Sequence, residues 1–143
     1  MSVNGDTSIA KILHGWLNTW TDKPTGIAFD DFSKGPPCMT FQPMSGTLIE
    51  RKYVDGSYIG VYPFAVAMRI SGEDTVERID AHATLSALGE WVRDSAPPTL
   101  GDGRTATEFD PSTPAKTSVY DNGAEDYQII ITMKYRQKGG NGS

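Results

Sequence analysis

The sequence predicts an α+β fold, with two amphipathic helices packed on one face of a mainly antiparallel, or mixed, sheet of four to six strands. Two stretches, residues 8–20 and 74–93, repeat apolar residues at helical spacing. The dipeptides Asp55-Gly56 and Asn122-Gly123, typical of tight hairpin turns, each separate two strand-like segments. Because strands cluster along the chain instead of alternating with helices, a layered α+β arrangement built on two hairpins is favoured.

Length and charge limit the alternatives. The 143 residues suit one hydrophobic core. We expect a single α+β domain over residues 1–137 and a flexible, glycine-rich C-terminal tail over residues 138–143. The net charge of −5 disfavours a face that binds nucleic acid, since such a face is basic. An acidic wall instead repels DNA and leaves it mobile.

The cysteine content and the termini indicate a reducing compartment. Cys38 is the single cysteine, which excludes an intrachain disulfide and a cysteine zinc site. The N-terminal residues are polar and lack the apolar core of a signal peptide. No apolar run is long enough to span a membrane. We therefore expect a protein made in the cytoplasm, with no membrane partner.

The first half of the chain predicts a helix, short strands and a long hairpin. The helix over residues 8–20 ends before Pro24 and Gly26, which cannot continue it. A short strand is expected over residues 38–42. The hairpin arms are residues 47–53 and 58–70, and the second arm is apolar on both faces, which predicts that both are covered. Pro63 predicts a bulge or an edge near its middle.

The second half predicts a helix, a loop and a second hairpin. Asp74 and Glu77 form a capping-box pattern at the start of the second helix. Residues 99–114 are polar and rich in turn residues, with a short strand at 105–109, so we expect a loop that is mobile unless a partner orders it. The last strand alternates, and one face is expected to join the core. That face carries Tyr127, Ile129, Ile131, Met133 and Tyr135.

No catalytic motif is present, and we expect neither enzyme activity nor a cofactor or metal. His82 and Asp80 are two positions apart on a helix and do not face each other. His14 lies on the polar face of the first helix. Neither Ser57 nor Cys38 sits in a nucleophile motif, and Cys38 is better explained as a small buried apolar residue. No histidine or cysteine spacing is typical of a metal site.

The order of these segments resembles the tail terminator family of long-tailed bacteriophages, also described as minor capsid or tail-to-head joining proteins. The resemblance runs from the first helix, IAKILHGWLNTW, through CMTFQPMSG and KYVDGSYIGVYPFAVAMRI to the second helix, ERIDAHATLSALGEWV. APPTL and the closing strand EDYQIIITMKY complete it. The hairpin turn followed by an aromatic strand is its most characteristic part.

The resemblance implies a structural protein of the virion tail or neck. Such subunits form a ring, typically of six copies, on the end of the tail tube, where they meet the tail-tube and head-completion proteins. DNA passes through the lumen of the ring without sequence-specific binding, which the acidic composition suits. Assembly would take place in the cytoplasm of the bacterial host.

The two hairpins and residues 99–114 are the expected subunit interface, because they carry candidate unpaired strand edges and several tyrosines. The candidate interface residues are Tyr53, Asp55, Tyr58, Tyr62, Arg104, Phe109, Tyr120 and Tyr135. Two alternatives remain open. One is another head–tail connector or a tail-tube subunit, and the other is a small ligand-binding domain or enzyme of non-viral origin.

Overall fold

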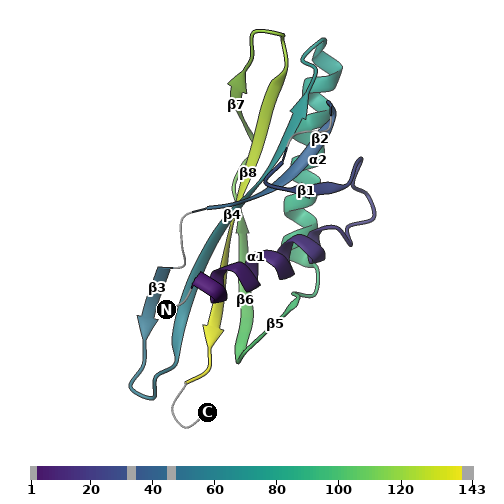
Figure 1. Ribbon diagram of the computed structural model, residues 1–143. Helices are drawn as coiled ribbons and strands as arrows, with labels where there is room; N and C mark the ends of the chain where they lie inside the picture. Colours follow the sequence, from purple (N-terminus) through teal and green to yellow (C-terminus); the bar gives the residue numbers. More distant parts are fainter. Residues whose placement is uncertain (1–2, 32–34, 45–47, 140–143) are drawn as a thin grey trace.

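A computed structural model describes residues 3–31, 35–44 and 48–139 of the chain. It is an α+β fold in which two helices pack on a twisted, mixed sheet of eight strands (Figure 1). The helices are α1 (Val3–Leu17) and α2 (Thr75–Asp94). The strands are β1 (Ile27–Phe29), β2 (Cys38–Pro43), β3 (Leu48–Lys52), β4 (Tyr58–Ile70), β5 (Thr99–Gly101), β6 (Arg104–Pro111), β7 (Ala115–Val119) and β8 (Glu125–Gln137).

The predicted fold class is confirmed, but the predicted count of four to six strands is too low. The strand order is β1-β2-β4-β8-β6-β5, with β3 added beside β4 and β7 beside β8. All pairs are antiparallel except β1 with β2, which makes the sheet mixed. The strands β1 and β5 have only three residues each, and β6 is longer than the segment expected at 105–109.

The sheet consists of two long hairpins whose second arms, β4 and β8, pair with each other over thirteen positions. The first arm of each hairpin is interrupted. Along β4, the partner of Phe64 is the last residue of β2 and the partner of Val61 is the first residue of β3. Pro63 lies in this gap, as a residue without a backbone donor should, and the predicted interruption is confirmed.

The corresponding gap beside β8 is bridged by a serine. The pairing of β6 ends at Ile131 and that of β7 begins at Gln128. Between them, the Ser112 backbone N–H donates to the Ile130 carbonyl at 2.7 Å, and the Ile130 N–H donates to the Ser112 hydroxyl at 3.0 Å. The hydroxyl therefore replaces a carbonyl of the ladder, between Pro111 and Pro114, which have no N–H of their own.

The core lies between the helices and one face of β4 and β8. The predicted alternation is confirmed on both strands. On β4 the even-numbered residues from Tyr62 to Ile70 are buried, and on β8 the odd-numbered residues from Tyr127 to Tyr135 are buried. Leu13, Leu17, Leu85 and Leu88 cover them from the helices. An aromatic cluster joins the layers, because the Trp16 ring lies 4.9 Å from that of Trp91 and 5.0 Å from that of Phe109.

The second face of β4 is covered only in part, whereas we predicted cover on both faces. Ala65 and Ala67 are buried there, because short side chains at the centre of a sheet are enclosed by longer neighbours. Ile59 and Val61 stay half-buried, and Ile130 of β8 is exposed.

Residues 99–114 are not the mobile loop that their composition predicts. They form β5 and β6, because β6 pairs with β8 and buries Ala106 and Phe109. The predicted tail is held at its start, where the Lys138 N–H donates to the Gly103 carbonyl at 2.8 Å. The rest of that prediction, residues 140–143, lies outside the described residues.

Both helices lie near their predicted positions. The first ends at Leu17, earlier than expected, although Trp20 still packs into the core. The N-cap half of the predicted capping box of α2 is confirmed, since the Glu77 N–H donates to the Asp74 carboxylate at 2.8 Å, whereas the Glu77 carboxylate bonds to residues that precede Asp74. The Glu77 carboxylate in turn accepts from the Ser71 hydroxyl and the Gly72 N–H, which lowers the pKa of Glu77.

Gly60 allows the Tyr135 ring to lie across β4. A Cβ atom at position 60 would overlap the ring carbons of Tyr135, which is buried.

We expect Gly60→Ala to lower the free energy of unfolding by about 1–3 kcal/mol, as overpacking does. Urea denaturation measures it. Gly15→Ala is the matched control, since no atom lies within 4 Å of a Cβ there. It should be neutral or stabilising by up to about 1 kcal/mol in helix α1. Equal effects of the two changes would contradict this account of the Gly60 contact.

Candidate functional site

The eight residues predicted at a subunit interface separate into a buried and an accessible group. Tyr62, Arg104, Phe109 and Tyr135 are each at most 9% exposed, so their side chains are occupied within the subunit. Tyr58 is half-buried and lies edge-on to Tyr135, with ring centroids 6.4 Å apart. The accessible residues are Tyr53, Asp55 and Tyr120.

Tyr53 and Asp55 lie at the tip of the β3–β4 hairpin. The Tyr53 N–H donates to the Ser57 carbonyl at 2.9 Å, and the Gly56 N–H donates to the Tyr53 carbonyl at 3.1 Å. The Asp55 carboxylate accepts from the Ser57 hydroxyl at 2.6 Å and from its N–H at 2.9 Å, and these bonds lower the pKa of Asp55. Gly56 has a φ of 89°, as this turn requires. The tip is therefore rigid, and between the two predicted residues it presents Val54, which is fully exposed.

Arg104 fastens the neighbouring β5–β6 turn. Its guanidinium donates to the Leu100 carbonyl at 2.9 Å and to the Gly101 carbonyl at 3.2 Å. A cavity of about 390 Å³ lies between this turn, the β3–β4 turn and the end of β8, and Asp55, Arg104 and Arg136 are among its lining residues. The structure thus brings Asp55 and Arg104 to one end of the molecule.

Tyr120 lies at the opposite end of β4, in a polar cluster that the sequence did not predict. Arg69 donates through Nε to the Asp126 carboxylate at 2.7 Å, and the Tyr120 hydroxyl donates to the same carboxylate at 2.5 Å. The Arg69 guanidinium also lies over the Tyr120 ring, 4.6 Å from its centroid. Burial opposes ionisation of Asp126, but the bonds from Arg69 and Tyr120 outweigh it and lower its pKa.

A second ion pair joins α2 to β8 beside this cluster. Arg78 donates through Nε to the Glu125 carboxylate at 3.0 Å and to the Gly72 carbonyl at 2.9 Å. The Tyr127 hydroxyl donates to Glu125 at 3.0 Å. The bond from Arg78 is the main reason why the pKa of Glu125 is lowered. The adjacent carboxylates of Glu125 and Asp126 thus each hold a different arginine.

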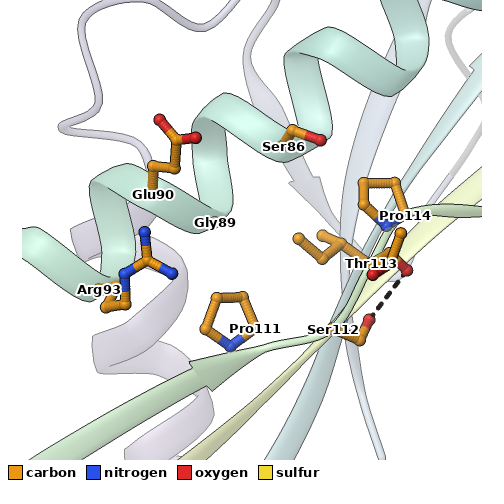
Figure 2. A pocket seen from close by; sticks show the side chains of 9 residues that line it. Ser86, Gly89, Glu90, Arg93, Pro111, Ser112, Thr113 and Pro114 are labelled. Atoms are coloured by element: carbon orange, nitrogen blue, oxygen red, sulfur yellow. Dashed lines mark hydrogen bonds between the residues drawn. The ribbon is translucent and has the colours of Figure 1, made fainter.

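A cleft of about 270 Å³ lies between α2 and the segment that joins β6 to β7. Figure 2 shows Glu90 and Arg93 on the helix side and Pro111, Ser112 and Pro114 on the strand side. The two elements approach closely because residue 89 is glycine, where a Cβ would come 2.9 Å from the Ile129 side chain. The cleft contains no nucleophile paired with a base.

The remaining candidates for chemistry have structural surroundings. His14 lies 2.8 Å from the Ile27 carbonyl through Nε2 and packs edge-on to Phe29. His82 is exposed and packs its ring against Tyr127. Cys38 is buried, as predicted, and burial raises the pKa of its thiol. Within the described ranges, no three His, Cys, Asp or Glu side chains gather where a metal ion could bind.

Exposed apolar side chains are the feature that the sequence analysis missed. Val54, Val76, Ile79 and Val119 are each at least 60% exposed. Val54 is exposed because the hairpin loop consists of three residues, Val54, Asp55 and Gly56, closed by the bond from the Tyr53 N–H to the Ser57 carbonyl, so Val54 belongs to no sheet face. Val76 and Ile79 belong to an apolar pattern on α2 that is wider than the buried stripe, and only the packing separates the two.

The chain matches no protein-family model, and no curated protein matches it significantly. The resemblance to tail terminators therefore stays a prediction. For the part of the chain that is described, neither helix combines the length and the apolar character that crossing a membrane requires.

The two buried carboxylates predict a pH dependence of stability. Their pKa values lie below the ordinary 4.5 for Glu125 and 3.8 for Asp126, so their stabilisation is complete above those values and is lost as the pH falls through the lowered ones. We expect a constant free energy of unfolding from pH 8 to 6 and a decline below about pH 5, measured by urea denaturation.

Asp126→Asn should destabilise the protein at pH 7 by about 1–3 kcal/mol and reduce the decline in acid, because it removes a charged acceptor shared by Arg69 and Tyr120. Asp121→Asn is the matched control in the same hairpin, since Asp121 is exposed, and should change stability by less than about 0.5 kcal/mol. An acid decline as steep in Asp126→Asn as in the wild type would contradict the assignment.

Proposed function

We propose that this chain is a structural subunit of a long-tailed bacteriophage, a tail terminator whose copies form a ring on the end of the tail tube. The ring has six copies in the pattern that the sequence resembles. Its neighbours are the tail-tube protein on one side and a head-completion protein on the other. The protein then belongs to the virion, after assembly in the bacterial cytoplasm.

The observation that carries the proposal is the position of the exposed apolar residues. Tyr53 and Val54 lie at the β3–β4 tip, before β4 begins, whereas Val76 and Ile79 follow its other end on α2. The thirteen residues of β4 span about 40 Å at 3.3 Å per residue. A ring needs two different surfaces on each subunit, because its contacts are head-to-tail. A small subunit with apolar residues at opposite ends supplies such surfaces.

Two further features support an assembly role. The outer edges of β3 and β7 carry no further strand among the described residues, and such edges pair with neighbouring chains. The net charge of −5 suits a lumen through which DNA slides without binding. In the cavity of about 390 Å³ the Ser57 hydroxyl is bonded to the Asp55 carboxylate, a contact that shapes the hairpin turn. The exposed apolar residues at the two ends of the molecule make assembly the function that the geometry supports best.

Electron microscopy with native mass spectrometry tests the proposal. Purified protein is mixed with tubes assembled from the tail-tube protein of the same phage. We expect a closed ring, with a mass of about six subunits of 15.5 kDa, at one end of each tube, and tubes of limited length. Because a ring of this kind ends polymerisation, adding the protein during tube growth should shorten the tubes.

Other outcomes contradict the proposal in distinct ways. Incorporation along the whole tube would identify a tube subunit. Binding to heads but not to tubes would identify a head-completion protein. A monomer that binds neither heads nor tubes would remove the virion assignment altogether.

A further inference from the structure

The β3–β4 hairpin ends in an apolar knob with basic flanks. We use the name tip knob for residues 51–54. Val54 is fully exposed and Tyr53 is 40% exposed, and Arg51 and Lys52 are exposed beside them. The hydrogen bonds between Asp55 and Ser57 hold this turn in one shape. A rigid knob loses little conformational entropy on binding, which favours a contact with a partner.

A groove of about 370 Å³ lies at the other end of β4, between that strand and the first half of α2. Met68 and Ile70, core residues that are almost fully buried, line it from the strand, Ala83 and Thr84 line it from the helix, and Pro24 and Pro37 complete the lining. Glu77 and Asp80 place two carboxylates on its rim. We call this the α2 groove. Val76 extends it, because residues 76, 80 and 83 lie on one face of the helix.

The tip knob and the α2 groove are complementary in charge and in polarity. The knob carries the exposed Val54 two residues after the basic pair Arg51 and Lys52, and the groove carries Glu77 and Asp80 on its helix side, next to apolar lining residues. Opposite charges at the rim of a contact set orientation and speed association. Burial of the exposed valine supplies the larger share of the affinity.

The two surfaces cannot meet within one subunit. The tip knob precedes the first residue of β4 and the α2 groove lies at its last residues, about 40 Å away along the strand. Figure 1 shows the β3–β4 turn at the lower end of the molecule and the end of β4 beside α2 at the upper end. A contact between them therefore joins two copies head to tail, which is the type of contact that closes a ring.

We propose that the tip knob of one copy docks in the α2 groove of the next copy, with Val54 against the strand lining formed by Met68 and Ile70. This inference rests on the proposed ring and names the contact that closes it. The occupant is a second copy of this chain. The same contact repeated around an axis uses every knob and every groove.

Disulfide trapping tests the contact directly. In a Cys38→Ala background, one batch carries Val54→Cys and a second carries Ala83→Cys, and the two are mixed and oxidised at high concentration. We expect a cross-linked dimer that forms only when both cysteines are present. Cross-linking in the Val54→Cys batch alone would show that tips pair with tips, and no cross-link in the mixture would show that the groove is not the docking site. Either result overturns the inference.

Substitutions test the same contact in solution. Val54→Asp should weaken self-association at least about tenfold, because it removes the valine that the contact would bury and places a negative charge beside Glu77 and Asp80. Ile130→Asp is the control, since Ile130 is also exposed but lies at the centre of β8, away from the tip knob, the α2 groove and the outer strand edges, and should leave association unchanged. Circular dichroism verifies that both variants fold. Equal association of Val54→Asp and wild type would contradict the inference.

A charge exchange adds a result that a structural role would not produce. Lys52→Glu and Asp80→Lys should each weaken association about three- to fivefold, and their combination in one chain should restore it. Association is measured by sedimentation.

If rings form on tubes but neither disulfide trapping nor charge exchange succeeds, the ring proposal stands and this contact is wrong. If trapping succeeds but no ring meets a tube, the contact stands and the tail terminator proposal is wrong.

Discussion

The structure depends on the antiparallel pairing of β4 with β8. Thirteen consecutive positions pair, from Tyr58 opposite Gln137 to Ile70 opposite Glu125, and every other strand except the short β1 and β5 pairs directly with one of these two. Each of the two strands presents its large apolar side chains to the same core. The approach is close enough that Gly60 must leave room for the Tyr135 ring. The gaps opposite Pro63 and Ile130, like the register shifts within β3, β6 and β7, fall in the outer arms, and the central pair continues without a break.

The two ends of this central pair have different characters. At one end, Arg69 and Arg78 hold the carboxylates of Asp126 and Glu125 and so fix the β7–β8 hairpin and the start of α2. At the other end, Asp55 and Ser57 shape a turn that leaves Val54 in solvent. One end of the molecule is held by ion pairs and the other projects an exposed apolar residue. Two different ends are suited to repeated head-to-tail contact, which connects the fold with the proposed role in a ring.

Sequence reasoning predicted what local patterns determine. Helical spacing located α1 and α2, the dipeptides Asp55-Gly56 and Asn122-Gly123 located the hairpins, and alternation located the core face of β4 and β8. It failed where pairing partners decide the outcome. Residues 99–114 have few apolar side chains and read as a loop, yet they form β5 and β6 because β8 offers an edge. Strand counts depend on such tertiary pairing, which propensity does not contain.

The candidate site was harder to predict than the fold, for the same reason. Tyr62 and Tyr135 are tyrosines on strands, like Tyr53, but burial depends on which face of the sheet each one takes. From the sequence, Arg104 is expected to be an exposed charge, but in the structure its guanidinium donates to the Leu100 and Gly101 carbonyls of the β5–β6 turn. Val54 and the α2 groove lie far apart in the sequence, and only the fold shows that they stand at opposite ends of one strand.

Hydrogen–deuterium exchange of the assembled ring, compared with that of the dissociated subunit, tests the central claim most directly. The account predicts new protection at residues 50–57 and 75–84, the tip knob and the wall of the α2 groove. It predicts no change along the centre of β4 and β8, which is already paired in the subunit. New protection confined to other segments, or an unpaired centre of β4 and β8 in the free subunit, would contradict it.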